Sequence, residues 1–179
     1  MSDPRVVPLI RTHQTREFTD QPVDEADLTS LADVARWSGS SANSQPWRFI
    51  LIREPATLRK IGEAGMPSTR AFVTATAAIA VTMPDEKERA VSHAYDEGRA
   101  AERILVGATL LGLGAAISWM QGDARQVVHA LLRLPADRRV RTVVAIGQPA
   151  ESAAKPKSTG GKARLPRDEV VFEERWPAD

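Results

Sequence analysis

A polar run that passes directly into an apolar run is the feature that most restricts how this chain can fold. Residues 40–48, SSANSQPWR, gather hydroxyl and amide side chains, and residues 49–52, FILI, follow them at once. The apolar run predicts a buried strand, which would hold the polar loop in place. We expect this loop either to present donors and acceptors to a small molecule or to form an ordinary turn, because Ser, Asn and Pro are common in turns.

Length and composition describe an ordinary globular protein. With 179 residues, 42% of them hydrophobic and 26% charged, the chain has enough apolar material for one core. We expect a single domain over residues 1–179, of which residues 150–179 form an extended arm. The 24 basic residues balance 23 acidic ones, so the charge gives no reason to expect nucleic acid or an anionic membrane as a partner.

Residue types that several kinds of chemistry need are absent or scattered. Cysteine is absent, which excludes disulfides, thiolate nucleophiles, iron–sulfur clusters and Cys-ligated zinc. The histidines at positions 13, 93 and 129 match no metal-ligand spacing, so we expect no metal site. The N-terminus lacks the apolar core of a signal peptide, and the apolar run at 72–83 is too short to span a bilayer. A cytoplasmic protein is the expectation.

Hydrophobic periodicity divides the chain into helices and strands. We expect helices over residues 4–12, 24–38, 55–62, 92–113 and 123–132, and strands over 49–52, the second half of 72–83, 116–120 and 140–146. Residues 63–71 are predicted to form an exposed loop, and 150–163 a linker. The apolar segment beyond that linker must dock on its own core or on a second subunit.

The long helix predicted over 92–113 is apolar nearly all round after Arg103, so we expect it to be buried, against the core or a partner subunit. The pair Gly112 and Gly114 at its end is reminiscent of a dinucleotide-binding loop. A phosphate-cradling motif, however, follows a strand, opens a helix and needs a third glycine. We interpret these glycines as a helix stop.

A second polar cluster lies in residues 11–18, RTHQTREF. Two arginines, a histidine and several hydroxyl or amide side chains stand close together before a phenylalanine. Arginine forks match the geometry of phosphate and other oxyanions. The cluster therefore indicates either an anion site or a solvated charged loop.

Together these features resemble the nitroreductase family of FMN-dependent oxidoreductases. The similarity extends over nearly the whole chain. It rests on elements in the family's order: the Arg/Thr/Arg-x-Phe element at 11–18, SSANSQPWRFI at 40–50, LGLG at 111–114, IGQP at 146–149 and KARLP at 162–166.

The resemblance implies an α+β fold in which helices flank a central, mostly antiparallel sheet. It also implies a homodimer with FMN at the subunit interface and a C-terminal segment exchanged between subunits. NADH or NADPH would donate hydride to flavin N5, and a small acceptor such as a nitroaromatic or a quinone would then be reduced by a ping-pong mechanism. No protein residue is expected to act as nucleophile or base, because the cofactor carries the chemistry.

The family's motifs also imply which residues bind the cofactor. Arg16 is expected beside flavin N1 and O2, where a fixed cation would stabilise the reduced form. The phosphate and ribityl chain of FMN are expected to contact Arg11, His13 and Gln14. One flavin edge is expected to contact Ser40, Ser41, Asn43 and Gln45, and the other edge Ser118 and Trp119. The phosphate is also expected to contact Lys162 and Arg164. The family usually has Arg where this chain has Thr12, so either Arg11 reaches the phosphate instead or that contact is lost.

Other functions remain open on the same residues. Within the fold, a flavoenzyme could act as a dehalogenase, an enone or azo reductase, or a flavin destructase. Outside enzymology, the chain could form a flavin-binding or flavin-storing dimer, or a structural dimer without cofactor. Turnover of NAD(P)H with menadione or a nitroaromatic would separate an enzyme from a storage protein.

Overall fold

A four-stranded antiparallel sheet forms the centre of the fold. In the computed structural model, which describes residues 3–153 and 164–176, the strand order is β1-β2-β4-β3. The strands are β1 (Arg48–Ile52), β2 (Ala77–Pro84), β3 (Gly114–Trp119) and β4 (Arg138–Gly147). The α+β fold predicted from the sequence is confirmed.

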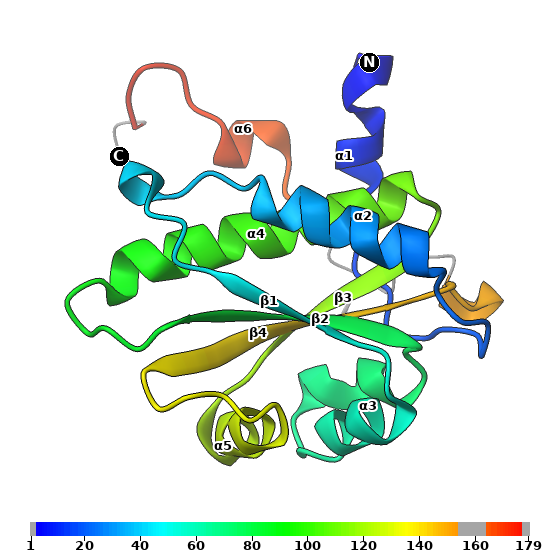
Figure 1. Ribbon diagram of the computed structural model, residues 1–179. Coiled ribbons are helices and arrows are strands. Elements are labelled where there is room, and N and C mark those ends of the chain that lie inside the picture. The colour runs from blue at the N-terminus through cyan, green and yellow to red at the C-terminus, as the bar shows by residue number, and fades with distance from the viewer. Residues whose placement is uncertain (1–2, 154–163, 177–179) are drawn as a thin grey trace.

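Helices cover both faces of this sheet (Figure 1). On one face lie α2 (Glu25–Arg36) and α4 (Ala90–Leu110), and on the other lie α3 (Pro55–Gly62) and α5 (Gly122–Leu131). The shorter elements are η1 (Pro4–Val6), α1 (Val7–Arg11), η2 (Ser41–Asn43), η3 (Pro67–Val73), η4 (Glu151–Ala153) and α6 (Arg167–Val170).

Strand β2 is buried on both faces. Ile79 and Val81 pack into the core on the side of α2 and α4, whereas Ala78 and Ala80 pack into the core on the side of α3 and α5. Successive side chains of a strand point to opposite faces, so a strand covered on both sides needs an unbroken apolar run. This explains the run in residues 72–83, and the strand predicted in its second half is confirmed.

The expectation of an exposed loop at 63–71 is wrong for the second half of that range. The chain forms η3 there, and Thr69 and Ala71 are completely buried. The Thr69 hydroxyl lies 3.1 Å from the carbonyl oxygen of Gly62, which ties η3 to the end of α3. A single short helical stretch has too few turns to display a periodicity, so the pattern did not reveal it.

Helix α4 lies across one face of the sheet, where it packs on β2, β3 and β4. Its 21 residues span about 32 Å, and Ala100, Ile104 and Ala108 are fully buried. Burial does not extend to its end, since Leu110 and Leu111 are 65% and 41% exposed in the single chain. Gly112 follows in the left-handed region, which confirms the predicted helix stop.

The segment Thr15–Phe18 is bound to the open side of β3 and to the end of β4. The backbone N–H of Thr15 donates to the carbonyl oxygen of Ala115 at 2.8 Å, and Phe18 forms a β-bridge with Pro149. Phe18 lies directly over Gly147, where an added Cβ would stand 2.8 Å from Phe18 Cγ. This close approach requires glycine.

We expect Gly147→Ala to lower the free energy of unfolding by about 1–3 kcal/mol, because the new methyl group overpacks the contact with Phe18. Denaturant unfolding followed by circular dichroism measures the change. Gly62→Ala is the matched control, since a Cβ there lies 3.5 Å from its nearest neighbours. The control should change stability by less than about 1 kcal/mol. Equal stability of Gly147→Ala and the parent protein would contradict the packing described.

Ionisable groups are buried between α4 and β4. Glu97 is 4% exposed and His93 is 1% exposed. Burial raises the pKa of the Glu97 carboxyl above its ordinary value of 4.5, although a hydrogen bond with Thr142 and the charge of Arg139 oppose the shift. The folded protein therefore holds this proton more tightly than the unfolded chain does.

The stability that protonated Glu97 contributes is present below pH 4.5 and is lost as the pH rises through the raised pKa of the folded state. We expect Glu97→Gln to remove this loss, so that its stability relative to the parent protein increases as the pH rises from 4.5. Urea unfolding at a series of pH values measures it. Glu102→Gln, on an exposed face of α4, should follow the parent curve. Parallel curves for Glu97→Gln and the parent protein would refute the assignment.

Candidate functional site

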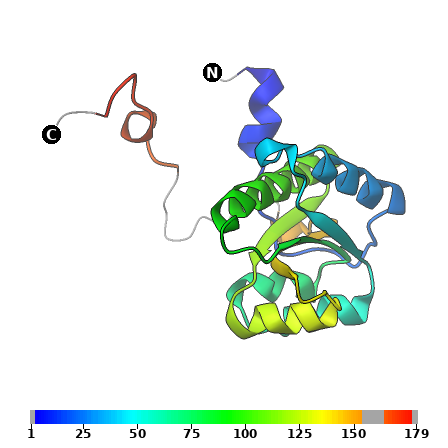
Figure 2. The same ribbon diagram turned by 60° about the vertical axis from the view of Figure 1, so that its left-hand side comes forward.

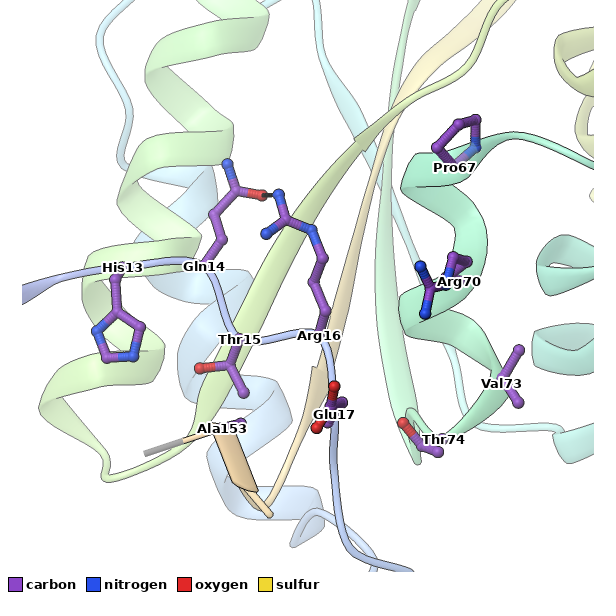
Figure 3. A pocket seen from close by; sticks show the side chains of 10 residues that line it. All are labelled: His13, Gln14, Thr15, Arg16, Glu17, Pro67, Arg70, Val73, Thr74 and Ala153. Carbon is purple, nitrogen blue, oxygen red and sulfur yellow. Dashed lines mark hydrogen bonds between the residues drawn. The ribbon is translucent and has the colours of Figure 1, made fainter. Parts of the chain in front are cut away.

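A cavity of about 740 Å³ opens beside β3, between the N-terminal segment and η3 (Figure 3). Its volume lies in the range of small-molecule sites, roughly 300–1,000 Å³. The residues that line it are His13, Gln14, Thr15, Arg16, Glu17, Pro67, Arg70, Val73, Thr74 and Ala153. Three predicted site residues, His13, Gln14 and Arg16, are thus brought together at one cavity.

Edge strand β3 fixes the wall that carries Arg16. Gln14 Oε1 accepts a hydrogen bond from the backbone N–H of Ile117 at 3.2 Å. The same oxygen accepts from Nη2 of Arg16 at 3.0 Å (Figure 3). Gln14 therefore links the exposed guanidinium to the sheet and restricts where its charge can lie.

Arg70 lies on η3, on the opposite side of the cavity from Arg16 (Figure 3). The two walls are joined where the backbone N–H of Phe18 donates to Thr74 Oγ1 at 3.1 Å. Arg70 was not predicted as a site residue, because the region 63–71 was expected to be an exposed loop. The available signal was Pro67, a residue that favours the first turn of a helix, followed within one turn by a cation.

The lining of the cavity has an excess of cationic groups. The guanidinium groups of Arg16 and Arg70 stand against the single carboxylate of Glu17. That carboxylate also accepts a hydrogen bond from Ser152 Oγ at 2.6 Å. A cavity with this balance of charge suits an anionic ligand.

The predicted loop residues Ser40, Ser41, Asn43 and Gln45 do not line this cavity. Their loop packs on the N-terminal half of α4, where the Ser41 N–H donates to the carboxylate of Asp96. The N-terminal segment instead lies near the C-terminal end of α4, where Thr15 meets Ala115. Along the helix from Asp96 to Leu110 the separation is about 20 Å. One chain therefore holds the two predicted groups apart.

Arg11 also lies outside the cavity lining. It ends α1 with an exposed side chain. The hydroxyl of neighbouring Thr12 donates to the carbonyl oxygen of Pro8 at 2.9 Å, so the Thr12 side chain caps the C-terminal end of α1.

The remaining predicted residues are dispersed. Ser118 is buried and its hydroxyl donates to the carbonyl oxygen of Ser68 in η3, whereas Trp119 is 57% exposed. Arg164 is exposed in the C-terminal segment 164–176, which stands away from the body of the chain (Figure 2). Lys162 lies outside the described residues.

Two further properties concern the part of the chain that the structure describes. Residues 3–153 and 164–176 contain no group of three or more His, Cys, Asp or Glu side chains that could hold a metal ion. No helix within these same ranges has the length and apolar character that crossing a membrane requires.

Comparison with known proteins points to one family. Residues 10–82, which include both the N-terminal cluster and the loop before β1, match the model of the nitroreductase family. A protein named NADH dehydrogenase from Thermus thermophilus is 26% identical, and the match covers 91% of this chain and 92% of that protein. One named FMN reductase [NAD(P)H] from Bacillus subtilis is also 26% identical, over 96% of this chain and 74% of its own.

Solved structures show the same fold. An FMN-dependent nitroreductase from Clostridium difficile superposes with a TM-score of 0.80 at 20% identity, over 95% of this chain and 99% of that one. The match of the family model, the relatives that align over most of this chain and the shared fold all point to the nitroreductase family.

Proposed function

We propose that this protein is an FMN-dependent oxidoreductase that passes hydride from NADH or NADPH to a small acceptor such as a nitroaromatic or a quinone. The observation that carries the proposal is the cationic cavity in which Arg16 is held against the sheet edge opposite Arg70. The names of the relatives, FMN reductase [NAD(P)H] and FMN-dependent nitroreductase, support it.

The residues present fit FMN. The cofactor has a phosphate and, once reduced, negative charge around N1 and C2=O, and both favour cationic partners. Arg16 would hold the pyrimidine edge, and His13 and Gln14 would hold the ribityl and phosphate part. Arg70 supplies a second guanidinium on the other wall, and Val73 adds an apolar surface for a ring to pack on.

When bound, the flavin would supply hydride transfer at N5. The chain's own part is to bind and orient. Arg16, fixed by Gln14 and through it by Ile117, would stabilise charge at one edge of the ring without moving. No nucleophile or general base is required of the protein. Donor and acceptor would use the same open cavity in turn, so ping-pong kinetics are expected.

We further propose that the working unit is a homodimer in which each site takes residues from both chains. Within one chain the loop Ser40–Gln45 and the Arg16 cavity lie at opposite ends of α4. Exposed apolar side chains extend along α1 and α4, including Leu9 (54%), Ile10 (62%), Tyr95 (73%) and Leu110 (65%). A second copy packed on this face would cover them and bring its loop toward the cavity.

The C-terminal segment fits the same arrangement. Its apolar side chains Leu165, Val170 and Trp176 are 60%, 52% and 80% exposed in the single chain. Docking on the partner subunit would bury them and carry Arg164, with Lys162 before it, toward the FMN phosphate. In this proposal residues 1–179 form one domain, whose arm begins near residue 150.

Titration with FMN, followed by addition of NADH or NADPH, tests the function. We expect tight binding, bleaching of the flavin absorbance by a reduced nicotinamide, and recovery of the absorbance on adding menadione. Arg16→Ala should weaken FMN binding roughly ten- to a hundredfold, the effect of losing a hydrogen bond to a charged group. Arg59→Ala, an exposed arginine on α3, is the control and should bind like the parent protein.

A protein that acquires no flavin spectrum on titration would refute the proposed function. A protein that binds FMN but shows no bleaching with either nucleotide would be a flavin-storage dimer. Unchanged affinity and unchanged reduction rate in Arg16→Ala would refute the role given to Arg16.

Mixed dimers test whether the site is shared between subunits. We expect an Arg16→Ala chain and a chain with both Asn43→Ala and Gln45→Ala each to form weakly active homodimers. Refolded together, they should recover up to about a quarter of parental activity, because half of the dimers are mixed and one site in each mixed dimer has neither defect. Activity no higher than the average of the two homodimers would contradict a shared site. A mixture of parent and Arg16→Ala chains calibrates the assay.

A further inference from the structure

We propose that Asp96 is a positioning residue that fixes the loop Ser40–Gln45 in the shape in which it contacts the cofactor. The expected effect on FMN binding rests on the proposed function, in which the loop contacts FMN. The anchoring itself rests on the contacts between α4 and the chain segment before β1.

Asp96 provides the anchor through a buried carboxylate. Its side chain is 3% exposed, and both of its oxygens accept from the backbone N–H of Ser41, at 3.1 and 3.2 Å. A hydrogen bond to a charged acceptor is about twice as strong as one between neutral groups. Ser41, the first residue of η2, is therefore held to α4 through its backbone N–H, and this contact does not involve the Ser41 side chain.

Two further residues of α4 hold the stem of the loop. Nη1 of Arg103 donates to the carbonyl oxygen of Trp37 at 2.9 Å. The Arg99 guanidinium lies on Gly39, where an added Cβ would overlap it. Asp96, Arg99 and Arg103 are spaced three and four residues apart, so they share one face of the helix. Residues 37, 39 and 41 thus each contact a different turn of α4, in the order Arg103, Arg99 and Asp96.

The loop that this face holds has a strained backbone. Ala42, Asn43 and Gln45 have φ angles of 50°, 51° and 47°, in the left-handed region that side chains other than glycine rarely adopt. The Ser40 hydroxyl accepts from the Gln45 N–H at 2.9 Å and closes the loop on itself. Such a conformation persists only where the surroundings determine it. The bond from Ser41 to Asp96 joins the closed loop to the helix.

The chemistry of Asp96 favours this role over a role in stability alone. Burying a carboxylate is costly, and its ion pair with Arg99 is long, at 3.9 Å. An apolar side chain at this position would serve the core at lower cost. The carboxylate does what an apolar group cannot do, which is to hold one particular backbone N–H at one place.

Amide hydrogen exchange and FMN titration on the full-length protein test the proposal. In Asp96→Ala we expect the Ser41 amide to exchange at least tenfold faster without flavin, and the Kd for FMN to rise about tenfold or more. Asp96→Asn keeps a neutral acceptor, so both effects should shrink to a few-fold. Asp123→Ala removes an exposed carboxylate on the other face of the sheet and should leave exchange and Kd unchanged.

A folded Asp96→Ala protein with parental Ser41 exchange or parental FMN affinity would overturn the proposal. Should that variant fail to fold, Asp96→Asn decides, because unchanged exchange together with unchanged affinity in it would equally overturn the role. Rescue by Asn separates positioning from a general loss of structure. A parent protein that binds no FMN would refute the proposed function, and Ser41 exchange would then decide alone whether Asp96 anchors the loop.

Discussion

The docking of Thr15–Phe18 on the edge of the sheet is the interaction on which the rest of the structure depends. It pairs Thr15 with Ala115 through the backbone, and it seats Phe18 on Gly147 at the end of β4. An open sheet edge has unpaired backbone groups that can pair with another chain, and this segment covers part of that edge. The same pairing supplies one wall of the cavity, so the stability of the edge and the placement of Arg16 have one physical cause.

Helix α4 is the second constraint on the structure, because it fixes where the two polar segments of the chain lie. Its buried face of small residues lets it lie close to the sheet, and its length sets how far apart the two polar groups of the chain are held. Its N-terminal half binds the loop before β1 through Asp96, and its C-terminal end adjoins the segment that carries Arg16. The helix holds the two groups near its two different ends, and this separation is the physical reason for proposing that two chains share each site.

Sequence patterns were most informative where the physical signal was local. The apolar run of β2 and the helix stop at Gly112 follow from side-chain burial or backbone freedom, and both are confirmed. The strand after the Ser40 loop is confirmed as β1, but the expectation that it is buried is wrong, because β1 lies at the edge of the sheet and only its Ile52 is buried. The helical segment η3 was missed because specific contacts stabilise it, such as the hydrogen bond from Thr69 to Gly62, and such contacts leave no periodic pattern of apolar residues in the sequence. Arg70 was missed with it.

The sequence by itself determined the fold class, the resemblance to the nitroreductase family and the chemical character of residues 11–18 and 40–48, because these depend on residue type and spacing. Only the tertiary structure decided which of these residues share a cavity. His13, Gln14 and Arg16 line one cavity with Arg70 of η3, whereas Ser41 is bound to Asp96 of α4. Such partnerships arise from hydrogen bonds and packing between segments more than fifty residues apart, and no local spacing encodes them.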